Sequence, residues 1–364
     1  MQSEKKKKIR VLVVDDSALM RKLISNLLEK DPELEVIATA IDGCFALSKV
    51  EQLKPDVVTL DVDMPRMDGL TALGEMVSKH NVPVIMLSSL TTRGAALTMQ
   101  ALEKGALDFV CKPSGTARLP EMADELVSKI KAAARTNVMA LNRTAQAGVP
   151  VKKRVRPTEQ KNGHGGVVAI GASSGGPHAL RHLLPRIPAD LDAGIVIVQH
   201  MPESFTAMLA NWLNEICELE IKEAESGDLA LPGKALIAPG SLHMKVRRTP
   251  EGCEVLLEGG ALVNGHKPSV DVLFHSVAQE YGSLATGIIM TGMGSDGARG
   301  LGEIKEAGGH TVAQDKESCA VYGMPRVAVE KGYANTIVPL TELASYLSFK
   351  VGRLAALEES YARS

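Results

Sequence analysis

The first 113 residues alternate between short, continuously apolar runs and segments with helical periodicity. Apolar runs without polar alternation are typical of strands in a parallel sheet that is covered on both faces. Strands are expected at Val11–Val14, Val57–Leu60 and Val82–Leu87, and helices at Leu19–Glu29, Phe45–Leu53, Leu70–Ser78 and Ala95–Glu103. The pattern predicts an α/β domain whose functional groups collect at the carboxyl ends of the strands.

The pattern changes after Ser114. A helix is predicted through Glu121–Asn142, followed by a segment, Thr144–Gly166, that carries Gly, Pro, Gln and a basic run. We interpret this segment as a solvated spacer, and contact of its basic run with an acidic partner is the alternative. The basic residues are Lys152, Lys153, Arg154 and Arg156.

A second alternation begins at Val167 and predicts another α/β domain. Its expected strands are Val167–Ile170, Ile195–Val198, Ala235–Ala238, Leu284–Met290 and Thr311–Ala313, and its expected helices are Ala179–Leu184, Phe205–Ile216, Val270–Tyr281 and Ala298–Ala307. Met244–Arg248 and Cys253–Glu258 flank the turn sequence Thr-Pro-Glu-Gly, which predicts a β-hairpin. We expect a doubly wound, mainly parallel fold with this hairpin added.

Composition narrows the classes of function. The 364 residues suffice for about two domains. With 41 basic and 43 acidic side chains and 3% aromatic residues, nothing favours binding to nucleic acid or to an anionic membrane. Five scattered cysteines fit a reducing cytosol.

The lysine-rich start leads into an apolar run too short for a signal peptide, and no apolar segment is long enough to cross a bilayer. We therefore expect a soluble, cytoplasmic protein.

Carboxylates follow two strands of the first domain. Asp15 and Asp16 end the first strand, Asp61 ends the Val57–Leu60 strand, and Lys112 ends the last strand. Capping of the following helices explains any one of these aspartates. Helix capping does not explain why the aspartates and Lys112 all stand at the ends of different strands. Crowded carboxylates with open positions suit Mg²⁺, and Lys112 would pair with an incoming phosphoryl group.

The stretches VLVVDDS, LDVDMPRMDG, MLSS and FVCKP make residues 9–113 resemble a two-component receiver domain. The resemblance implies a flavodoxin-like fold with a five-stranded parallel sheet. It also implies phosphorylation of Asp61 by a sensor histidine kinase, in a reaction that needs Mg²⁺. The implied metal site is formed by Asp15, Asp16, Asp61 and the backbone carbonyl of Asp63, and the implied switch residues are Ser88, Phe109 and Lys112.

In the second domain, Gly171–Gly175 forms a G-x-S-x-G frame between a strand and a helix. Such a frame exposes the hydroxyl of Ser173 at a tight turn, where N–H groups at the helix start stabilise an oxyanion. Ser174 remains an alternative nucleophile, and a Gly/Ser-rich loop with a serine N-cap is the alternative without catalysis.

A nucleophilic serine needs a base and a residue that orients the base. His200 ends the strand Ile195–Val198, and Asp296 follows the strand Leu284–Met290, so both are expected at the sheet edge that carries Ser173. The order Ser, His, Asp differs from that of the fold that usually carries G-x-S-x-G. The remaining histidines give no defined pattern: His178 and His182 read as a surface pair, and His243, His266 and His275 could line the cleft.

One motif favours a different function. Gly292–Gly297 fits G-x-G-x-x-G after a strand, and Asp315 stands where an acid that binds a ribose is expected. Against dinucleotide binding, the motif lies late in its domain, and the carboxylate of Asp296 would repel a pyrophosphate. A third hypothesis is a signalling adaptor whose second domain only binds partners.

Residues 167–340 resemble the catalytic domain of the chemotaxis methylesterases, the CheB type, in IGASSGGP, VIVQHMP, IAPGSLHM, GHKPSVDVLFHSVA, TGMGSDGARG and YGMPRVA. The resemblance implies Ser173 as nucleophile, His200 as base and Asp296 as orienting residue, with Ser174 and Met293 in the oxyanion region. The family usually has Thr at the position of Ser174, and both residues carry a hydroxyl.

The resemblance implies hydrolysis of glutamyl γ-methyl esters on chemotaxis receptors, without a cofactor for the esterase step, together with deamidation of receptor glutamines. We expect residues 1–125 to form the receiver, 126–165 a helical and flexible linker, and 166–355 the methylesterase domain. Phosphorylation of Asp61 is expected to release inhibition by a receiver that packs over the hydrolase cleft.

Overall fold

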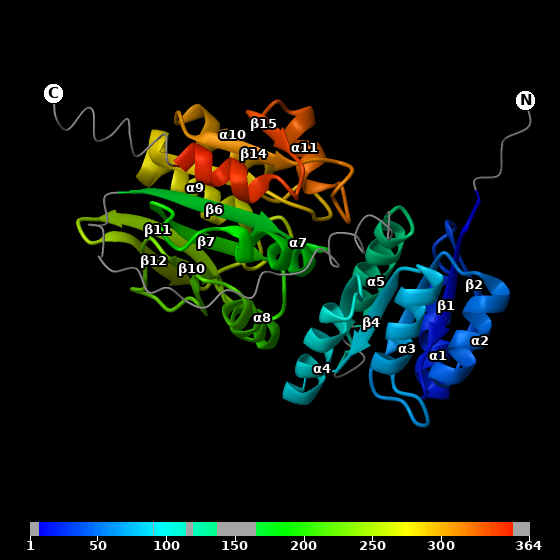
Figure 1. The fold of residues 1–364 in the computed structure, drawn as a ribbon. Helices are drawn as coiled ribbons and strands as arrows, with labels where there is room; N and C mark the ends of the chain where they lie inside the picture. The colour runs from blue at the N-terminus through cyan, green and yellow to red at the C-terminus, as the bar shows by residue number, and fades with distance from the viewer. Residues whose placement is uncertain (1–6, 90, 114–118, 137–164, 352–364) are drawn as a thin grey trace, which may run out of the picture. The chain divides into compact units, whose positions relative to one another are not determined.

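The computed structural model describes residues 7–89, 91–113, 119–136 and 165–351, and the chain divides into two compact units, Met1–Asn142 and Arg143–Ser364 (Figure 1). The expected spacer Thr144–Gly166, with its basic run, lies outside the described residues as far as residue 164. No helix within the described ranges is long and apolar enough to cross a membrane.

The first unit contains a five-stranded, fully parallel sheet in the order β2-β1-β3-β4-β5. This is the flavodoxin-like order, and it confirms the fold predicted for residues 9–113. The strands are β1 (Ile9–Val14), β2 (Leu34–Ala40), β3 (Val57–Asp61), β4 (Val84–Ser88) and β5 (Asp108–Cys111). The helices are α1 (Ala18–Leu28), α2 (Gly43–Leu53), α3 (Gly69–Glu75) with its π-helical continuation η1 (Met76–His80), α4 (Thr92–Glu103) and α5 (Leu119–Ala133).

The helix starts in this unit separate capping aspartates from those at the sheet edge. Asp42 and Asp68 cap α2 and α3 by accepting hydrogen bonds from Phe45 N and Thr71 N, and Ser17 caps α1. Asp61 caps no helix. The helix predicted through Glu121–Asn142 ends sooner than expected, at Ala133, where i→i−3 hydrogen bonds tighten its last turn. Residues 137–142 lie outside the described residues.

The second unit contains a seven-stranded parallel sheet in the order β15-β14-β13-β6-β7-β10-β8, and a three-stranded antiparallel sheet, β11-β12-β9. The strands are β6 (Gly166–Ala172), β7 (Ala193–Gln199), β8 (Glu220–Glu223), β9 (Leu229–Ala230), β10 (Lys234–Ile237), β11 (His243–Thr249), β12 (Gly252–Glu258), β13 (Ala285–Ile289), β14 (His310–Gln314) and β15 (Thr336–Val338). The helices are α7 (Gly176–Leu183), α8 (Glu203–Ile216), α9 (Val270–Tyr281), α10 (Ala298–Glu306) and α11 (Met324–Glu330), with 3₁₀ turns η3 (Leu184–Arg186) and η4 (Gly282–Leu284). The predicted hairpin is confirmed as β11 and β12, in which Thr249 pairs with Gly252.

The order of strands makes β6 the topological switch point of the sheet. The chain runs from β6 to β7 on one side, whereas β13 pairs with β6 on the other side. In open parallel sheets, such a switch point leaves a crevice at the carboxyl ends of the strands, and ligands bind there. Ala172 ends β6, Gln199 ends β7 and Ile289 ends β13, so the loops that follow these residues meet at this edge.

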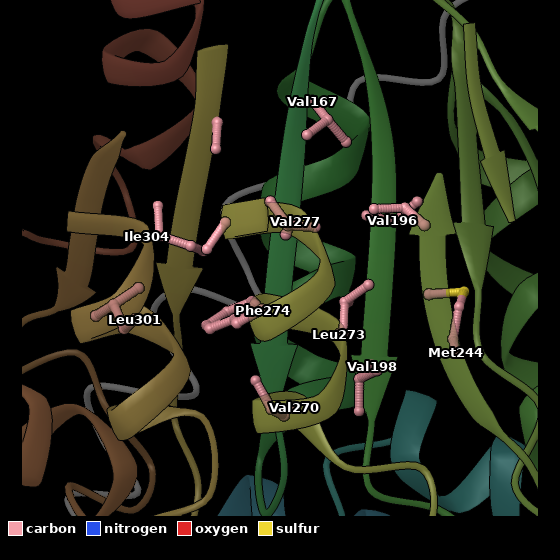
Figure 2. Close-up of a cluster of buried hydrophobic side chains, with 14 of the residues drawn as sticks. Val167, Val196, Val198, Met244, Val270, Leu273, Phe274, Val277, Leu301 and Ile304 are labelled. Carbon is pink, nitrogen blue, oxygen red and sulfur yellow. The ribbon is translucent and has the colours of Figure 1, made fainter. Parts of the chain in front are cut away.

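Helix α9 is anchored between the parallel sheet and the hairpin (Figure 2). Val270, Leu273, Phe274 and Val277 of α9 are fully buried and belong to one apolar cluster with side chains of β6, β7, β11 and α10. A Cβ atom at Gly171 would lie 2.2 Å from Val270 Cγ1, so glycine is needed at the end of β6 for α9 to approach. This packing fixes the N-terminus of α9 beside the crevice.

Candidate active site and acidic pocket

Ser173 follows β6 directly, at the turn that leads into α7. Its N–H donates to Thr291 O at 3.0 Å, and its carbonyl accepts from Gly176 N at 2.8 Å and from Gln199 Nε2 at 2.9 Å. Gly175 has φ +75°, in the left-handed region that favours glycine. Hydrogen bonds to the loop after β13, to β7 and within the turn itself therefore fix the backbone of Ser173, and the Ser173 side chain is half-buried.

His200 stands next to Ser173 because β6 and β7 are parallel neighbours. Ala172 pairs with Gln199, and His200 N donates to Ala172 O at 3.0 Å. His200 Nε2 lies 2.8 Å from Asp296 Oδ2, and the two side chains are 7% and 0% exposed. Nδ1 of His200 is buried without a hydrogen-bond partner in the described part of the chain, which leaves that nitrogen for a further donor.

The Asp296 carboxylate accepts several hydrogen bonds besides the one from His200. Val270 N donates to Oδ2 at 2.7 Å, and Ser269 Oγ and Asn264 Nδ2 each donate to Oδ1 at 2.8 Å. Burial by itself would raise the pKa of Asp296, but the hydrogen bond and charge of His200, with those of Asn264 and Val270, hold that pKa well below its usual range. Asp296 is therefore ionised and fixed in orientation at neutral pH.

The loop after β13 lies against the serine. A Cβ atom at Gly292 would lie 2.8 Å from Ser173 Cβ and 2.3 Å from Met324 Sδ, so this close approach needs glycine. Thr291 Oγ1 donates to Ser174 O at 2.9 Å, which ties the loop to the nucleophile turn. Ser174 is buried and Met293 half-buried, and their backbone N–H groups donate no hydrogen bond within the described ranges.

The other histidines divide into different roles. His266 stacks on His200 with ring centroids 3.8 Å apart and an interplanar angle of 13°, so it does line the site. His243 is buried and structural: its Nδ1 accepts from Ser269 N, and its Nε2 donates to Ala261 O. His275 pairs with Glu303 at 2.6 Å, and His182 is buried, unlike the surface position expected for it.

The G-x-G-x-x-G motif has a different environment from a dinucleotide site. Its fifth residue, Asp296, is buried against His200, and Asp315 accepts hydrogen bonds from the N–H and hydroxyl of Ser318. Both carboxylates are thus engaged by groups of the protein itself.

The first unit brings its acidic residues together as expected. Asp15, Asp16 and Asp61 each offer an oxygen within 4.8 Å of the others. Lys112 Nζ lies 2.8 Å from Asp15 Oδ2 and 2.7 Å from Asp61 Oδ2. Burial raises the pKa of Asp61 to about 6, against the lowering influence of Lys112 and with a further contribution from the Asp15 and Asp16 charges. Three hard oxygen donors whose negative charge Lys112 compensates only in part fit a divalent cation.

The other residues predicted for this site follow β3 or lie on β4 and β5. The exposed Asp63 side chain pairs with Arg93, with Oδ1 3.3 Å from Nη2. Ser88 is buried at the end of β4, where its hydroxyl lies 2.6 Å from Thr98 Oγ1 and donates to Gly94 O at 3.1 Å. Phe109 is buried in β5, and Lys129 Nζ lies 5.3 Å from the centre of its ring.

Asn264 and Ser269 are the contacts that sequence reasoning missed. Both lie in the segment before α9: Ser269 belongs to the stretch GHKPSVDVLFHSVA and Asn264 directly precedes it, but the resemblance assigned neither residue a role. The Asn264-Gly265 pair marks a tight turn but carries no information about a carboxylate partner.

Comparisons with known proteins cover both units. Residues 168–347 match the family described as CheB methylesterase, and residues 11–124 match the response regulator receiver domain. A protein-glutamate methylesterase/protein-glutamine glutaminase 2 from Koribacter versatilis is 51% identical over 93% of this chain and 95% of its own length. A protein-glutamate methylesterase/protein-glutamine glutaminase from Pyrococcus horikoshii is 44% identical over 93% and 92%. The solved CheB methylesterase catalytic domain of Thermotoga maritima is 39% identical, with a TM-score of 0.50, over 50% of this chain and 97% of that domain.

Proposed function

The chain belongs to the CheB methylesterase family, carries a response regulator receiver domain and is a carboxylic-ester hydrolase, and from this we propose that it removes methyl groups from glutamyl γ-methyl esters of chemotaxis receptors under control of phosphorylation. The curated relatives named above are called protein-glutamate methylesterases, which supports the substrate class. A cytoplasmic location follows from this proposal, because the kinase and the methylated helices of such receptors are cytoplasmic.

We assign the first step to Ser173, His200 and Asp296. Ser173 Oγ attacks the ester carbonyl carbon while its proton passes to the unpartnered Nδ1 of His200. Asp296, bonded to Nε2, holds the ring in the tautomer with Nδ1 unprotonated and stabilises the imidazolium that forms. The carbon–methoxy bond then breaks, and the imidazolium gives its proton to methoxide, which leaves as methanol.

Water completes the cycle. His200 takes a proton from water as the oxygen attacks the acyl-enzyme, and returns it to Ser173 as the glutamate product leaves. The negative oxygen of each tetrahedral intermediate would be stabilised by the free N–H groups of Ser174 and Met293, which flank the serine from two different loops. Apart from water, this proposed chemistry uses only groups of the protein.

The same machinery would deamidate receptor glutamines. The attacked group is then a carboxamide, and His200 protonates the departing nitrogen so that ammonia leaves in place of methanol. The resulting acyl-enzyme is identical, so its hydrolysis follows the same route. The name protein-glutamine glutaminase carried by the relatives supports this second activity.

In the receiver we assign phosphorylation to Asp61. A carboxylate oxygen of Asp61 attacks the phosphorus of a kinase phosphohistidine, and the phosphorus–nitrogen bond breaks. Asp15, Asp16, Asp61 and the Asp63 carbonyl would hold Mg²⁺, which when bound supplies positive charge beside the phosphoryl oxygens. Lys112 would pair with the new phosphoryl group.

Phosphorylation of Asp61 is the event that would start the switch. Ser88 would leave its contact with Thr98 to meet a phosphoryl oxygen, and Phe109 would move with it. We propose that the unphosphorylated receiver restrains the hydrolase and that this change relieves the restraint. A coupling free energy of about 1–3 kcal/mol would alter activity by roughly 5–150-fold.

The His200–Asp296 pair next to Ser173, with Nδ1 unpartnered, is the single observation that carries the proposed reaction. Its test is methanol release from methyl-labelled receptor membranes by wild type and Ser173→Ala, with and without a small phosphodonor and Mg²⁺. We expect release that rises with phosphodonor and is lost in the variant. Release by Ser173→Ala at the wild-type rate would refute the assigned nucleophile, and release that ignores the phosphodonor would refute the switch.

A further inference from the structure

The segment between β12 and α9 makes a tight turn whose shape depends on Asn264. Val263 and His266 exchange two backbone hydrogen bonds, of 3.0 and 2.9 Å. Between them, Asn264 has φ +53° and Gly265 has φ +80°. Two successive positive φ angles define a type I′ turn, in which Asn-Gly is the favoured pair. The turn is therefore encoded locally and holds Asn264 in one orientation.

The side-chain amide of Asn264 links two carboxylates. Its Nδ2 atom donates to Asp296 Oδ1 at 2.8 Å and to Asp271 Oδ2 at 2.7 Å. An amide nitrogen carries two hydrogens, so both of its donors are used. Asp271 is held in turn by Gly300 N, which donates to its Oδ1 at 2.7 Å. The amide thus lies between two acidic groups that would otherwise face each other.

These two carboxylates repel one another. Burial, opposed by the Gly300 hydrogen bond and reinforced by the Asp296 charge, raises the pKa of Asp271. The other charged or titratable groups nearby are His200 after β7, His266 in the turn and Arg299 on α10. The cavity that Asn264 and Asp271 line also contains His243, Lys245, Glu258, His275, Lys331 and Tyr333. The amide donates to both carboxylates and adds no charge. An aspartate at the same position would donate to neither carboxylate and would add a negative charge.

Two residues of the turn affect His200, one through Asp296 and one directly. Asn264 contacts the carboxylate that orients His200, and His266, two residues further, stacks on the His200 ring. Resting on the proposed function, we infer that Asn264 is a positioning residue of the hydrolase: its amide separates Asp296 from Asp271 and fixes the charge that His200 experiences. Asn264 contacts no reacting atom and acts through Asp296.

The decisive variant is Asn264→Asp, which keeps the size of the side chain. It removes both donors and adds a third carboxylate beside Asp296. Additional negative charge stabilises the imidazolium form of His200, so the base stays protonated to higher pH. We expect the acid limb of the pH profile of kcat/KM to move upward by at least one pH unit. At pH values on the wild-type acid limb, kcat/KM should therefore fall about tenfold, whereas KM should change less than about twofold.

Two matched variants separate this effect from a general one. Asn264→Asp combined with Asp271→Asn exchanges the acid and the amide and restores the number of carboxylates, so it should recover most of the pH profile. Asn214→Asp adds the same charge to the same unit at a side chain that accepts from Ile221 N, away from β6 and β13, and should match wild type. A wild-type pH profile in Asn264→Asp, or a loss that is equal at every pH and unrelieved by Asp271→Asn, would overturn the inference.

A second readout does not depend on turnover. The titration of His200 can be followed by NMR of ring-labelled full-length protein in a Ser173→Ala background, with and without Asn264→Asp. A higher His200 pKa in the Asn264→Asp protein supports the inference even if no receptor ester is hydrolysed, in which case the proposed function fails alone. An unchanged His200 pKa refutes the inference even if wild type is an active esterase.

Discussion

At the scale of single residues, the Asp296 carboxylate is held by several donors at once, because His200, Val270, Ser269 and Asn264 all donate to it. Asp296→Asn would place an amide opposite these donors and remove the charge that supports an imidazolium. We expect kcat to fall by about 10²–10⁴-fold, and Ser173→Ala to cost at least as much. Methanol release measures both. Asp190→Asn, at an exposed carboxylate, serves as control, and an Asp296→Asn enzyme within threefold of wild type would contradict the assigned role.

Asp61 gives the receiver a pH-dependent stability. Its pKa of about 6 in the folded state lies above the ordinary 3.8, so the folded state binds this proton more tightly than the unfolded chain. Stability from Asp61 is therefore lost as the pH rises from about 4 to 6, and the loss is complete above that range. Asp61→Asn avoids the loss, which corresponds to roughly 3 kcal/mol.

Unfolding of residues 1–142 in urea at several pH values tests this prediction. The free energy of unfolding of Asp61→Asn should exceed that of wild type by an amount that grows between pH 4 and pH 6 and then levels off. Mg²⁺ at about a hundred times its Kd should add roughly 2.7 kcal/mol to wild type at pH 7 and less to the variant. A difference between the two proteins that does not change with pH would contradict the raised pKa.

At the scale of elements, the sequence predicted the inner strands of the two parallel sheets, whereas the edge strands received no predicted range. The central strands β1, β3, β6 and β7 are continuous apolar runs and are almost fully buried. The missed edge strands β2 and β8 include exposed or half-exposed positions with charged side chains, and the strand before Lys112, β5, was expected without a residue range. Edge strands are buried on fewer sides, so hydrophobic pattern alone does not mark them.

The same reasoning explains which site residues could be predicted. Ser173, His200, Asp61 and Lys112 follow buried strands, and parallel strands bring their carboxyl ends together. Asn264 and Ser269 lie in the segment before α9. Their contact with Asp296 depends on the packing of α9 against β6, where Gly171 leaves room for Val270. No local pattern encodes that packing.

The loop from Thr291 to Gly297 determines where the nucleophile stands. An alanine at Gly292 would have to displace Ser173 or Met324, because its Cβ atom would lie 2.8 and 2.3 Å from their atoms. We expect Gly292→Ala to lower kcat by about 10²-fold, since a misplacement of about 1 Å has that effect. Gly259→Ala, where a Cβ atom would meet nothing within 4 Å, should match wild type. Circular dichroism must show a folded Gly292→Ala protein, and unaltered turnover in that protein would refute the tight contact.

At the scale of the whole molecule, the two compact units can be tested separately. The proposed triad, the turn around Asn264 and the seven-stranded sheet all lie in Arg143–Ser364, and the acidic pocket lies in Met1–Asn142. Since each unit has its own sheet and buried core, residues 143–364 should fold and hydrolyse esters without the receiver.

The rate of this fragment decides how the receiver acts. If the unphosphorylated receiver restrains the hydrolase, the fragment should exceed the unphosphorylated full-length protein by roughly 5–150-fold and should ignore phosphodonor and Mg²⁺. Asp61→Asn in the full-length protein is the matched control, because it retains the receiver and cannot be phosphorylated at that position. It should stay at the unphosphorylated rate in the presence of phosphodonor. A fragment no faster than unphosphorylated full-length protein would show that phosphorylation adds activity instead of relieving inhibition, since removing the receiver would then have removed nothing that opposes turnover.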